Sequence, residues 1–192
     1  MSKLKSTILV LGASSFLTKP LIKNLEYENL FEIICQSRSD IKDSISTNSD
    51  ITFLRINYEE KKYELKIFQN CDYIINFVNA SELNQYEILN FRRFLEHVLT
   101  ISNPSLIHIS SASVYGNCSN KVISEISKCS PKNKYQRNKF KDEIELQEIA
   151  NNHSIKLFIL RPTELIGDKS LNGIKFIKSY QSASNIKRYL LK

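Results

Sequence analysis

The stretch that decides the fold is Thr7–Ile22, with the sequence TILVLGASSFLTKPLI. A run of apolar residues ends in a turn of small residues, and a helical pattern follows directly. A strand, a glycine-containing turn and a helix in this order are typical of the unit that binds the phosphates of a dinucleotide at the start of its helix. The turn contains a single glycine, Gly12, so the stretch raises the question of whether a nucleotide can still bind.

Apolar runs and amphipathic segments alternate along the rest of the chain. The predicted strands are Ser6–Leu11, Phe31–Gln36, Ile51–Ile56, Tyr73–Val78, Ser105–Ser110 and Lys156–Leu160. The predicted helices are Phe16–Leu25, Tyr58–Gln69, Gln85–Ile101 and Lys134–Asn151. Strands that are apolar throughout are typical of a parallel sheet with helices on both faces. We therefore expect an α/β fold with a doubly wound parallel sheet, whose ligands bind beyond the carboxyl ends of the strands.

The net charge of +7 does not by itself indicate a nucleic-acid partner. Lysines and arginines are scattered and mixed with acidic residues, and no nucleic-acid-binding motif accompanies them. No segment is apolar enough to span a bilayer, and the short apolar run after the first lysines lacks a cleavage site. We expect a cytoplasmic protein that binds neither nucleic acid nor a membrane.

The cysteines give no sign of disulfides or of a metal site. Cys35, Cys71, Cys118 and Cys129 lie far apart in the sequence, and no histidine pair has the spacing of metal ligands. Reduced thiols and no bound metal are therefore expected.

Three motifs at the predicted strand ends occur in a characteristic order. GASSFLT follows the first strand, HISSASVYG covers the fifth strand and its end, and YQRNK opens the next helix. Together they resemble the extended short-chain dehydrogenase/reductase family, in its branch of NAD-dependent nucleotide-sugar epimerases and dehydratases. Weaker similarities lie in CDYIINFVNA, LNFRRFLEHV and LRPTELIG, so the resemblance covers about Lys5–Gly167. It implies a Rossmann fold.

The resemblance implies that Ser111, Tyr135 and Lys139 are catalytic. Tyr135 and Lys139 are four residues apart and share one helix face. A phenol titrates near about 10, so proton transfer near neutral pH needs a pKa lower by about 3, or about 4 kcal/mol. A neighbouring ammonium and an oxidised nicotinamide both favour the phenolate. By themselves, Ser110 and Ser113 have the same chemistry as Ser111, and Tyr135 is also compatible with an ordinary exposed helix tyrosine.

The same resemblance implies a set of cofactor-binding residues. They are Gly12, Ser14, Ser15, Phe16, Leu17, Arg38, Asn57, Tyr58, Val78, Asn79, Lys139, Arg161 and Pro162. The turn departs from the family pattern, because Ser15 and Thr18 replace its second and third glycines. A serine can take the required backbone if its φ stays negative, so we expect binding to be retained but weaker than with glycines.

The choice of cofactor depends on the end of the second strand. An acid there suits the ribose of NAD, whereas an arginine suits the 2′-phosphate of NADP. The sequence CQSRSD offers Arg38 and no acid before Asp40, which favours NADP slightly over NAD. Arg38 is also compatible with a solvated loop charge.

The segment after Gly167 is short for the substrate-binding part of this family. We expect residues 1–167 to form the NAD(P)-binding domain and residues 168–192 a short, truncated substrate-binding extension. The motifs predict hydride transfer, and another small carbonyl compound fits them as well as a nucleotide-linked sugar does. The resemblance implies the nucleotide-linked sugar as substrate and a homodimer formed by the helices at Gln85–Ile101 and Lys134–Asn151. The alternative is a noncatalytic nucleotide-binding or interaction protein that keeps the fold.

Overall fold

The computed structural model describes residues 5–41, 51–59, 64–117, 122–163 and 165. The chain divides into two compact units, residues 1–161 and residues 162–192. Every helix and strand named below belongs to the first unit. The domain boundary that we predict at Gly167 lies outside the described residues.

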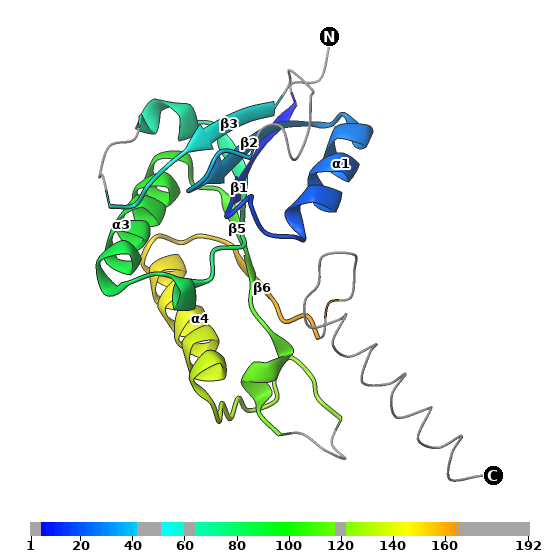
Figure 1. Ribbon diagram of the computed structural model, residues 1–192, viewed down its shortest axis with the longest axis vertical. Helices are drawn as coiled ribbons and strands as arrows, with labels where there is room; N and C mark the ends of the chain where they lie inside the picture. Colours follow the sequence, from blue (N-terminus) through cyan, green and yellow to red (C-terminus); the bar gives the residue numbers. More distant parts are fainter. Residues whose placement is uncertain (1–4, 42–50, 60–63, 118–121, 164, 166–192) are drawn as a thin grey trace, which may run out of the picture. The chain divides into compact units, whose positions relative to one another are not determined.

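The first unit contains a parallel sheet with the order β3-β2-β1-β4-β5-β6 (Figure 1). Its strands are β1 (Ser6–Leu11), β2 (Phe31–Ser37), β3 (Ile51–Arg55), β4 (Cys71–Asn76), β5 (Ser105–Ile109) and β6 (Leu157–Leu160). All five neighbouring pairs are parallel. The order reverses between β1 and β4, which confirms the doubly wound sheet and places the switch point beside the first strand.

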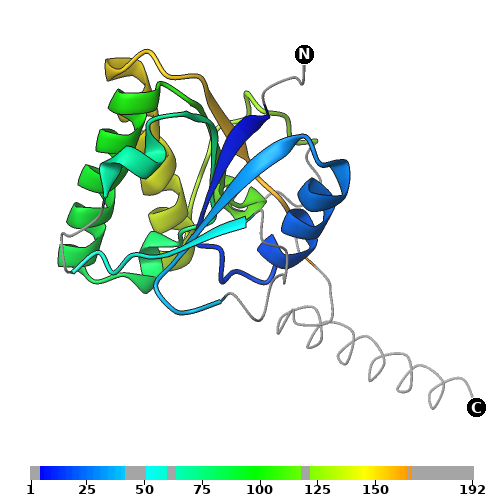
Figure 2. The same cartoon turned by 90° about the horizontal axis from the view of Figure 1, so that it is seen from above.

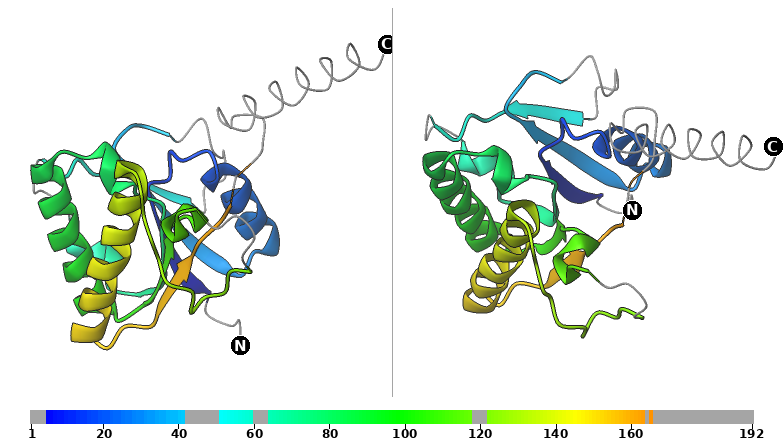
Figure 3. Two further views of the ribbon diagram at one scale, coloured as in Figure 1. Left: turned by 90° about the horizontal axis from the view of Figure 1, so that it is seen from below. Right: turned by 60° about the horizontal axis from the view of Figure 1, so that its bottom comes forward.

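Helices cover both faces of the sheet (Figures 1 and 2). Helix α1 (Thr18–Glu28) lies on one face, whereas α3 (Gln85–Ser102) and α4 (Lys134–Asn152) lie side by side on the other (Figure 3). Three short 3-10 helices, η1 (Leu65–Phe68), η2 (Ala80–Glu82) and η3 (Ala112–Tyr115), complete the described elements. The carboxyl ends of the strands lead into the turns and loops that carry the sequence motifs.

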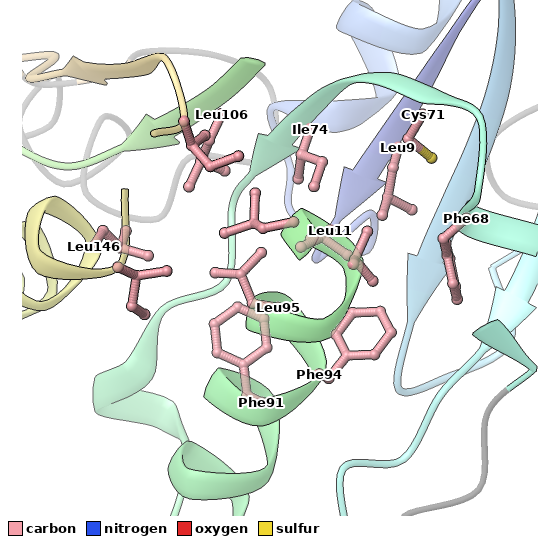
Figure 4. Packing of buried hydrophobic residues seen from close by; sticks show 14 of the residues in the cluster. Leu9, Leu11, Phe68, Cys71, Ile74, Phe91, Phe94, Leu95, Leu106 and Leu146 are labelled. Carbon is pink, nitrogen blue, oxygen red and sulfur yellow. The ribbon is translucent and has the colours of Figure 1, made fainter. Parts of the chain in front are cut away.

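The larger core packs the sheet against α3 and α4 (Figure 4). Leu9 and Leu11 of β1 lie in one cluster with Phe94 and Leu95 of α3, and all four are fully buried. Phe94 also packs edge-on against Phe68, with ring centroids 5.4 Å apart. The alternate residues of the same strand join a second cluster on the α1 face, as expected for a sheet buried on both sides.

Capping boxes fix where α3 and α4 begin. The Asn84 side chain accepts from the Glu87 N–H while the Glu87 carboxylate accepts from the Asn84 N–H, and Asn133 and Gln136 do the same for α4. These reciprocal bonds satisfy N–H groups that the first helical turn leaves without partners. Because Asn133 is the N-cap, Tyr135 is the second residue of α4.

The prediction of a helix at Tyr58–Gln69 is wrong. Tyr58 lies in a turn, and among the described residues of this segment, 58–59 and 64–69, Leu65–Phe68 form the helical turn, of the 3-10 type. Phe68 is the buried residue of η1, and one buried position in this turn is too few to stabilise a longer helix there.

Three predicted boundaries also shift by two residues. Strand β4 begins at Cys71, which pairs with Thr7, and it ends at Asn76 rather than Val78. The chain turns there because the Asn76 side chain accepts a hydrogen bond from the Val78 N–H at 2.9 Å. Helix α1 begins at Thr18 rather than Phe16, since the turn that precedes it is longer than predicted.

The described residues contain no helix that is long and apolar enough to cross a membrane. Within the same ranges, no three His, Cys, Asp or Glu side chains come close enough together to hold a metal ion. Cys35, Cys71 and Cys129 are free thiols, and Cys118 lies outside the described residues.

Candidate active site

The turn after β1 needs its glycine for two reasons. Gly12 has φ +72°, a conformation that side chains with a Cβ rarely adopt. A Cβ at this position would also lie 3.0 Å from the Val78 backbone nitrogen and 3.1 Å from the Phe77 carbonyl carbon. The glycine therefore lets the end of β4 pass directly beside the turn.

The backbone of the turn presents donors that the protein itself does not use. In the part of the chain that the structure describes, no acceptor contacts the N–H groups of Ser14, Phe16 and Leu17. The Leu17 side of the turn is also the N-terminus of α1, and no side chain caps it. Free N–H groups at a helix N-terminus are suited to a phosphate, because the helix dipole adds a positive end.

The two residues that replace glycines fit the turn in different ways. Ser15 does not have a positive φ, and its N–H donates to the Gly12 carbonyl at 3.0 Å. Thr18 is fully buried, and its hydroxyl lies 2.6 Å from the carbonyl oxygens of both Ala13 and Ser15. The threonine side chain therefore fills the space under the helix, and its hydroxyl stabilises the turn through these contacts.

A buried glutamine at the end of β2 links the turn to the edge of the sheet. The Gln36 side-chain oxygen accepts from the Gly12 N–H at 3.3 Å and from the Tyr58 hydroxyl at 2.8 Å. Its amide donates to the Ile56 carbonyl at 3.2 Å. Burial raises the pKa of Tyr58. The Tyr58 side chain, which we predict to bind cofactor, is thus only 2% exposed and lies in the core, while Asn57 beside it is half-buried.

Arg38 lies just beyond β2 and is half exposed. One of its guanidinium nitrogens is 3.3 Å from the carboxylate of Glu87, the capping-box residue of α3. Its carbonyl oxygen accepts from the Arg55 side chain at 3.2 Å. Arg38 is therefore held at the carboxyl end of the sheet, in an ion pair with the start of α3.

The end of β4 carries Val78 and Asn79, which follow Asn76 and lie half-buried beside the glycine turn. The Asn79 amide donates to Glu82 at 2.9 Å. The Val78 backbone nitrogen is therefore close to Gly12.

The serines after β5 differ in their surroundings. Ser110 is buried and donates its hydroxyl to Glu143 of α4. Ser111 is half-buried, and its oxygen lies 2.9 Å from the Ser113 oxygen while it accepts from the Ser113 N–H at 3.2 Å. Geometry thus separates Ser110, which is engaged in the interior, from Ser111 and Ser113 at the strand end.

Helix α4 brings Lys139 to the same strand end. The ammonium donates to the Ile109 carbonyl at 3.3 Å, two residues before Ser111, and the side chain is only 6% exposed. Burial lowers the pKa of Lys139, whereas the carboxylates of Asp142, Glu82 and Glu143 act in the opposite direction. Tyr135, one turn earlier, is 45% exposed.

A buried ion pair fixes α4 against the ends of β5 and β6. Arg161 donates two hydrogen bonds to Glu143, at 3.0 and 2.7 Å, and a third to the Tyr115 hydroxyl at 2.7 Å. Glu143, one turn after Lys139, is 1% exposed, and its hydrogen bonds raise the pKa of Arg161. Arg161, which we predict to bind cofactor, has its guanidinium directed at protein groups, and Pro162 follows it as the first residue of the second unit.

Several of these residues have no signal in the sequence. Gln36 and Glu143 are polar residues in segments that read as an ordinary strand and an ordinary helix. Their partners lie 18 to 33 residues away, so the sequence does not indicate which groups they contact. The pattern Tyr135, Lys139, Glu143, at steps of four, is the feature that could have pointed to Glu143, because it places all three on one helix face.

Comparison with known proteins agrees with this geometry. The NAD dependent epimerase/dehydratase family matches residues 8–190. No curated protein matches the sequence.

Solved structures with the same fold include three of different description. UDP-glucuronic acid 4-epimerase from Bacillus cereus, in complex with NAD, is 24% identical with a TM-score of 0.69, over 84% of this chain and 58% of that one. dTDP-glucose 4,6-dehydratase from Bacillus anthracis str. Ames, in complex with NAD, is 15% identical with a TM-score of 0.65, over 81% and 54%. The terminal R domain from the myxalamid PKS-NRPS biosynthetic pathway is 19% identical with a TM-score of 0.67, over 87% and 51%.

These likenesses describe the fold, and the chain spans little more than half the length of each of the three structures. The family match is broader, because it runs from β1 through the glycine turn, the β5 serines and the Tyr135–Lys139 helix. On that match, this chain belongs to the NAD dependent epimerase/dehydratase family.

Proposed function

We propose that the protein is an NAD(P)-dependent epimerase, dehydratase or reductase that transfers hydride between a nicotinamide cofactor and a nucleotide-linked sugar. The observation that carries the proposal is the position of Lys139. Its ammonium is buried at the end of β5, beside the strand end that carries Ser111 and one helical turn from Tyr135. In the described part of the chain no carboxylate is within ion-pair distance of this ammonium. A buried charge without such a pair is costly, which favours a chemical role for Lys139.

The residues of the glycine turn fit the cofactor. The open N–H groups of Ser14, Phe16 and Leu17 would hold its pyrophosphate, and Gly12 leaves room for its close approach. The family resemblance implies that Asn57, after β3, lies near the adenine, and that Val78 and Asn79, after β4, lie between the glycine turn and Lys139. When bound, the nicotinamide supplies the hydride acceptor or donor.

The chain's own residues would carry out the proton transfer. Tyr135 would accept a proton from a substrate hydroxyl, and Lys139, one helical turn later, would supply a positive charge on the same helix face. Ser111 donates a hydrogen bond to the same substrate oxygen and holds it in place. The half-exposed Tyr135 is open to a substrate in the present arrangement.

The proposal is tested first by binding. Titration of the pure protein with NADPH and with NADH should enhance and blue-shift the nicotinamide fluorescence. We expect NADPH to bind more tightly than NADH, with Arg38→Ala weakening NADPH binding by about tenfold, the loss of about one charge-assisted hydrogen bond. Arg137→Ala is the matched control. No change with either cofactor at millimolar concentration would contradict the proposal.

Turnover tests the catalytic residues separately. Tyr135→Phe should abolish hydride transfer to a nucleotide-sugar substrate and leave cofactor affinity within about twofold, because the substitution removes only the proton-bearing oxygen. Tyr27→Phe is the control, since Tyr27 is an exposed tyrosine on α1. Equal activity in Tyr135→Phe would remove this residue from the mechanism.

A second candidate is a noncatalytic nucleotide-binding or interaction protein. The replacement of two turn glycines by Ser15 and the fully buried Thr18 favours it. Cofactor binding without turnover on nucleotide sugars or small carbonyl compounds would support this candidate. A small-carbonyl reductase would instead show turnover with the second class of compound alone.

We further propose that the protein forms a homodimer through α3 and α4. Both helices carry large apolar side chains that are exposed in the single chain: Tyr86 (52%), Leu89 (44%) and Ile144 (41%). Pairing of the two helices with their symmetry copies would give a four-helix interface. Light scattering that shows only monomer would contradict this proposal.

A further inference from the structure

A small cavity lies between the sheet and the helices α3 and α4, beneath the end of β5. Its volume is about 20 Å³, which is enough for one water molecule. Two polar atoms among its lining residues are buried without a hydrogen-bond partner, Nε2 of His108 on β5 and Oδ2 of Asp142 on α4. In the described part of the chain these two are the side-chain atoms in that condition.

The hydrogen bonds around His108 determine which of its nitrogens carries the proton. The Val78 N–H donates to Asn76 Oδ1 at 2.9 Å, so the amide nitrogen of Asn76 must be the atom that faces the histidine. That nitrogen lies 3.2 Å from His108 Nδ1 and can only donate to it. Nδ1 is therefore an acceptor, and the proton of the neutral ring is on Nε2.

The two unpartnered atoms are thus complementary. Burial, together with the nearby Lys139 charge, lowers the pKa of His108 to about 3, so the ring is neutral at physiological pH and Nε2–H is a donor. The Asp142 carboxylate is an acceptor. A cavity large enough for one water, with a donor on one side and an acceptor on the other, offers that water two polar partners.

We propose that one internal water molecule in this cavity accepts a hydrogen bond from the Nε2–H of His108 and donates one to Oδ2 of Asp142. This link makes His108 and Asp142 positioning residues for Lys139. The link continues a chain of hydrogen bonds that begins at the Val78 N–H, beside the glycine turn. It ends on α4, three residues after Lys139.

The link matters because Asp142 is the carboxylate that does most to keep Lys139 protonated. Burial raises the pKa of Asp142 to about 6, and the charged groups that face it are Lys139, Glu145 and Lys141 on α4 and Arg92 on α3. A water that donates to Asp142 favours its ionised form, so His108 supports the charge of Lys139 through Asp142. The hydrogen-bond link stands on its own, whereas its value for catalysis rests on the proposed function of Lys139.

The test is nuclear magnetic resonance on the full chain without cofactor, so its outcome does not depend on whether the protein is an enzyme. Nitrogen-15 spectra should show His108 as the Nε2–H tautomer across pH 6 to 8, and its Nε2 proton should give a cross-peak to water. His153, which is exposed, serves as the internal reference for a ring in contact with solvent. A Nδ1–H tautomer, or an Nε2 proton without a water cross-peak, would overturn the proposal.

Two substitutions test the coupling to Lys139. Asp142→Asn should lower the pKa of Lys139, followed by its carbon-13 ε resonance, by about one pH unit, whereas Glu148→Gln on the exposed side of α4 should leave it unchanged. His108→Phe should raise the midpoint of the Asp142 carboxyl titration. A Lys139 pKa that moves by less than about 0.3 in Asp142→Asn would contradict the proposed coupling. So would a midpoint of the Asp142 titration that does not rise in His108→Phe.

Discussion

Replacement of Glu143 by alanine should be among the most destabilising single changes in the protein. The carboxylate is 1% exposed, and it accepts hydrogen bonds from Arg161 at 3.0 and 2.7 Å and from the Ser110 hydroxyl. Glu143→Ala would leave the guanidinium and a buried hydroxyl without their acceptor. Removal of one partner of a buried ion pair costs about 3–5 kcal/mol.

The structure places the expected cost at the lower end of this range. The Arg161 side chain keeps 19% of its exposure and its 2.7 Å bond to Tyr115, so part of its charge can still be solvated. We therefore expect a loss of about 3 kcal/mol in the free energy of unfolding. At about 2–4 °C per kcal/mol for a protein of this size, Tm should fall by roughly 6–12 °C.

Urea denaturation followed by circular dichroism measures this loss, and Glu148→Ala on the exposed side of the same helix is the control. The double variant Glu143→Ala/Arg161→Ala should be less destabilised than the sum of the two single variants by about 2 kcal/mol, because it removes both charges together. A cost below about 1 kcal/mol for Glu143→Ala, or additive single costs, would refute the reasoning.

Three further predictions concern the glycine turn and the buried histidine. Gly12→Ala should abolish cofactor binding and destabilise the fold, because its Cβ would lie 3.0 Å from the Val78 nitrogen at a positive φ; wild-type affinity in a fluorescence titration would contradict this. Thr18→Val removes a hydroxyl that lies 2.6 Å from two carbonyl oxygens and should cost about 1–2 kcal/mol by urea denaturation, whereas Thr100→Val, which changes an exposed hydroxyl on α3, should cost less. His108 has a pKa lowered to about 3, so its contribution to stability is present above the unfolded value of about 6.5 and is lost as the pH falls. Wild type should therefore lose about 2 kcal/mol more than His108→Gln between pH 6.5 and 5, and parallel stability curves for the two proteins would show that the ring is not buried as a neutral group.

The sequence predicts the strands well because their signal is local. The run at Ser6–Leu11 is apolar throughout, and the structure gives β1 the same bounds. The ends of the long helices are equally local, since Asn84 and Asn133 are N-cap residues immediately before the predicted starts. The segment after β3 is harder to predict because a run of four charged residues between two tyrosines gives no clear period.

The candidate site is less accessible to sequence reasoning. The motifs predict that Ser111, Tyr135 and Lys139 belong together, and the structure brings Lys139 to the strand end that carries Ser111. No sequence pattern could indicate that Arg161 points at Glu143, or that Tyr58 is a core residue held by Gln36. Such pairs are contacts between residues far apart in the sequence, and no regular spacing in the sequence identifies the two partners.

The ion pair between Arg38 and Glu87 has a consequence for engineering the cofactor preference. Glu87 also closes the capping box of α3, so the guanidinium that we propose for the 2′-phosphate is already neutralising a group that the fold uses. An acidic residue at position 38, the usual route toward NAD, would set two carboxylates against each other at the start of a helix. A substitution at position 38 would therefore change both the cofactor preference and the start of α3. A successful change of preference from NADP to NAD would have to redesign positions 38 and 87 together.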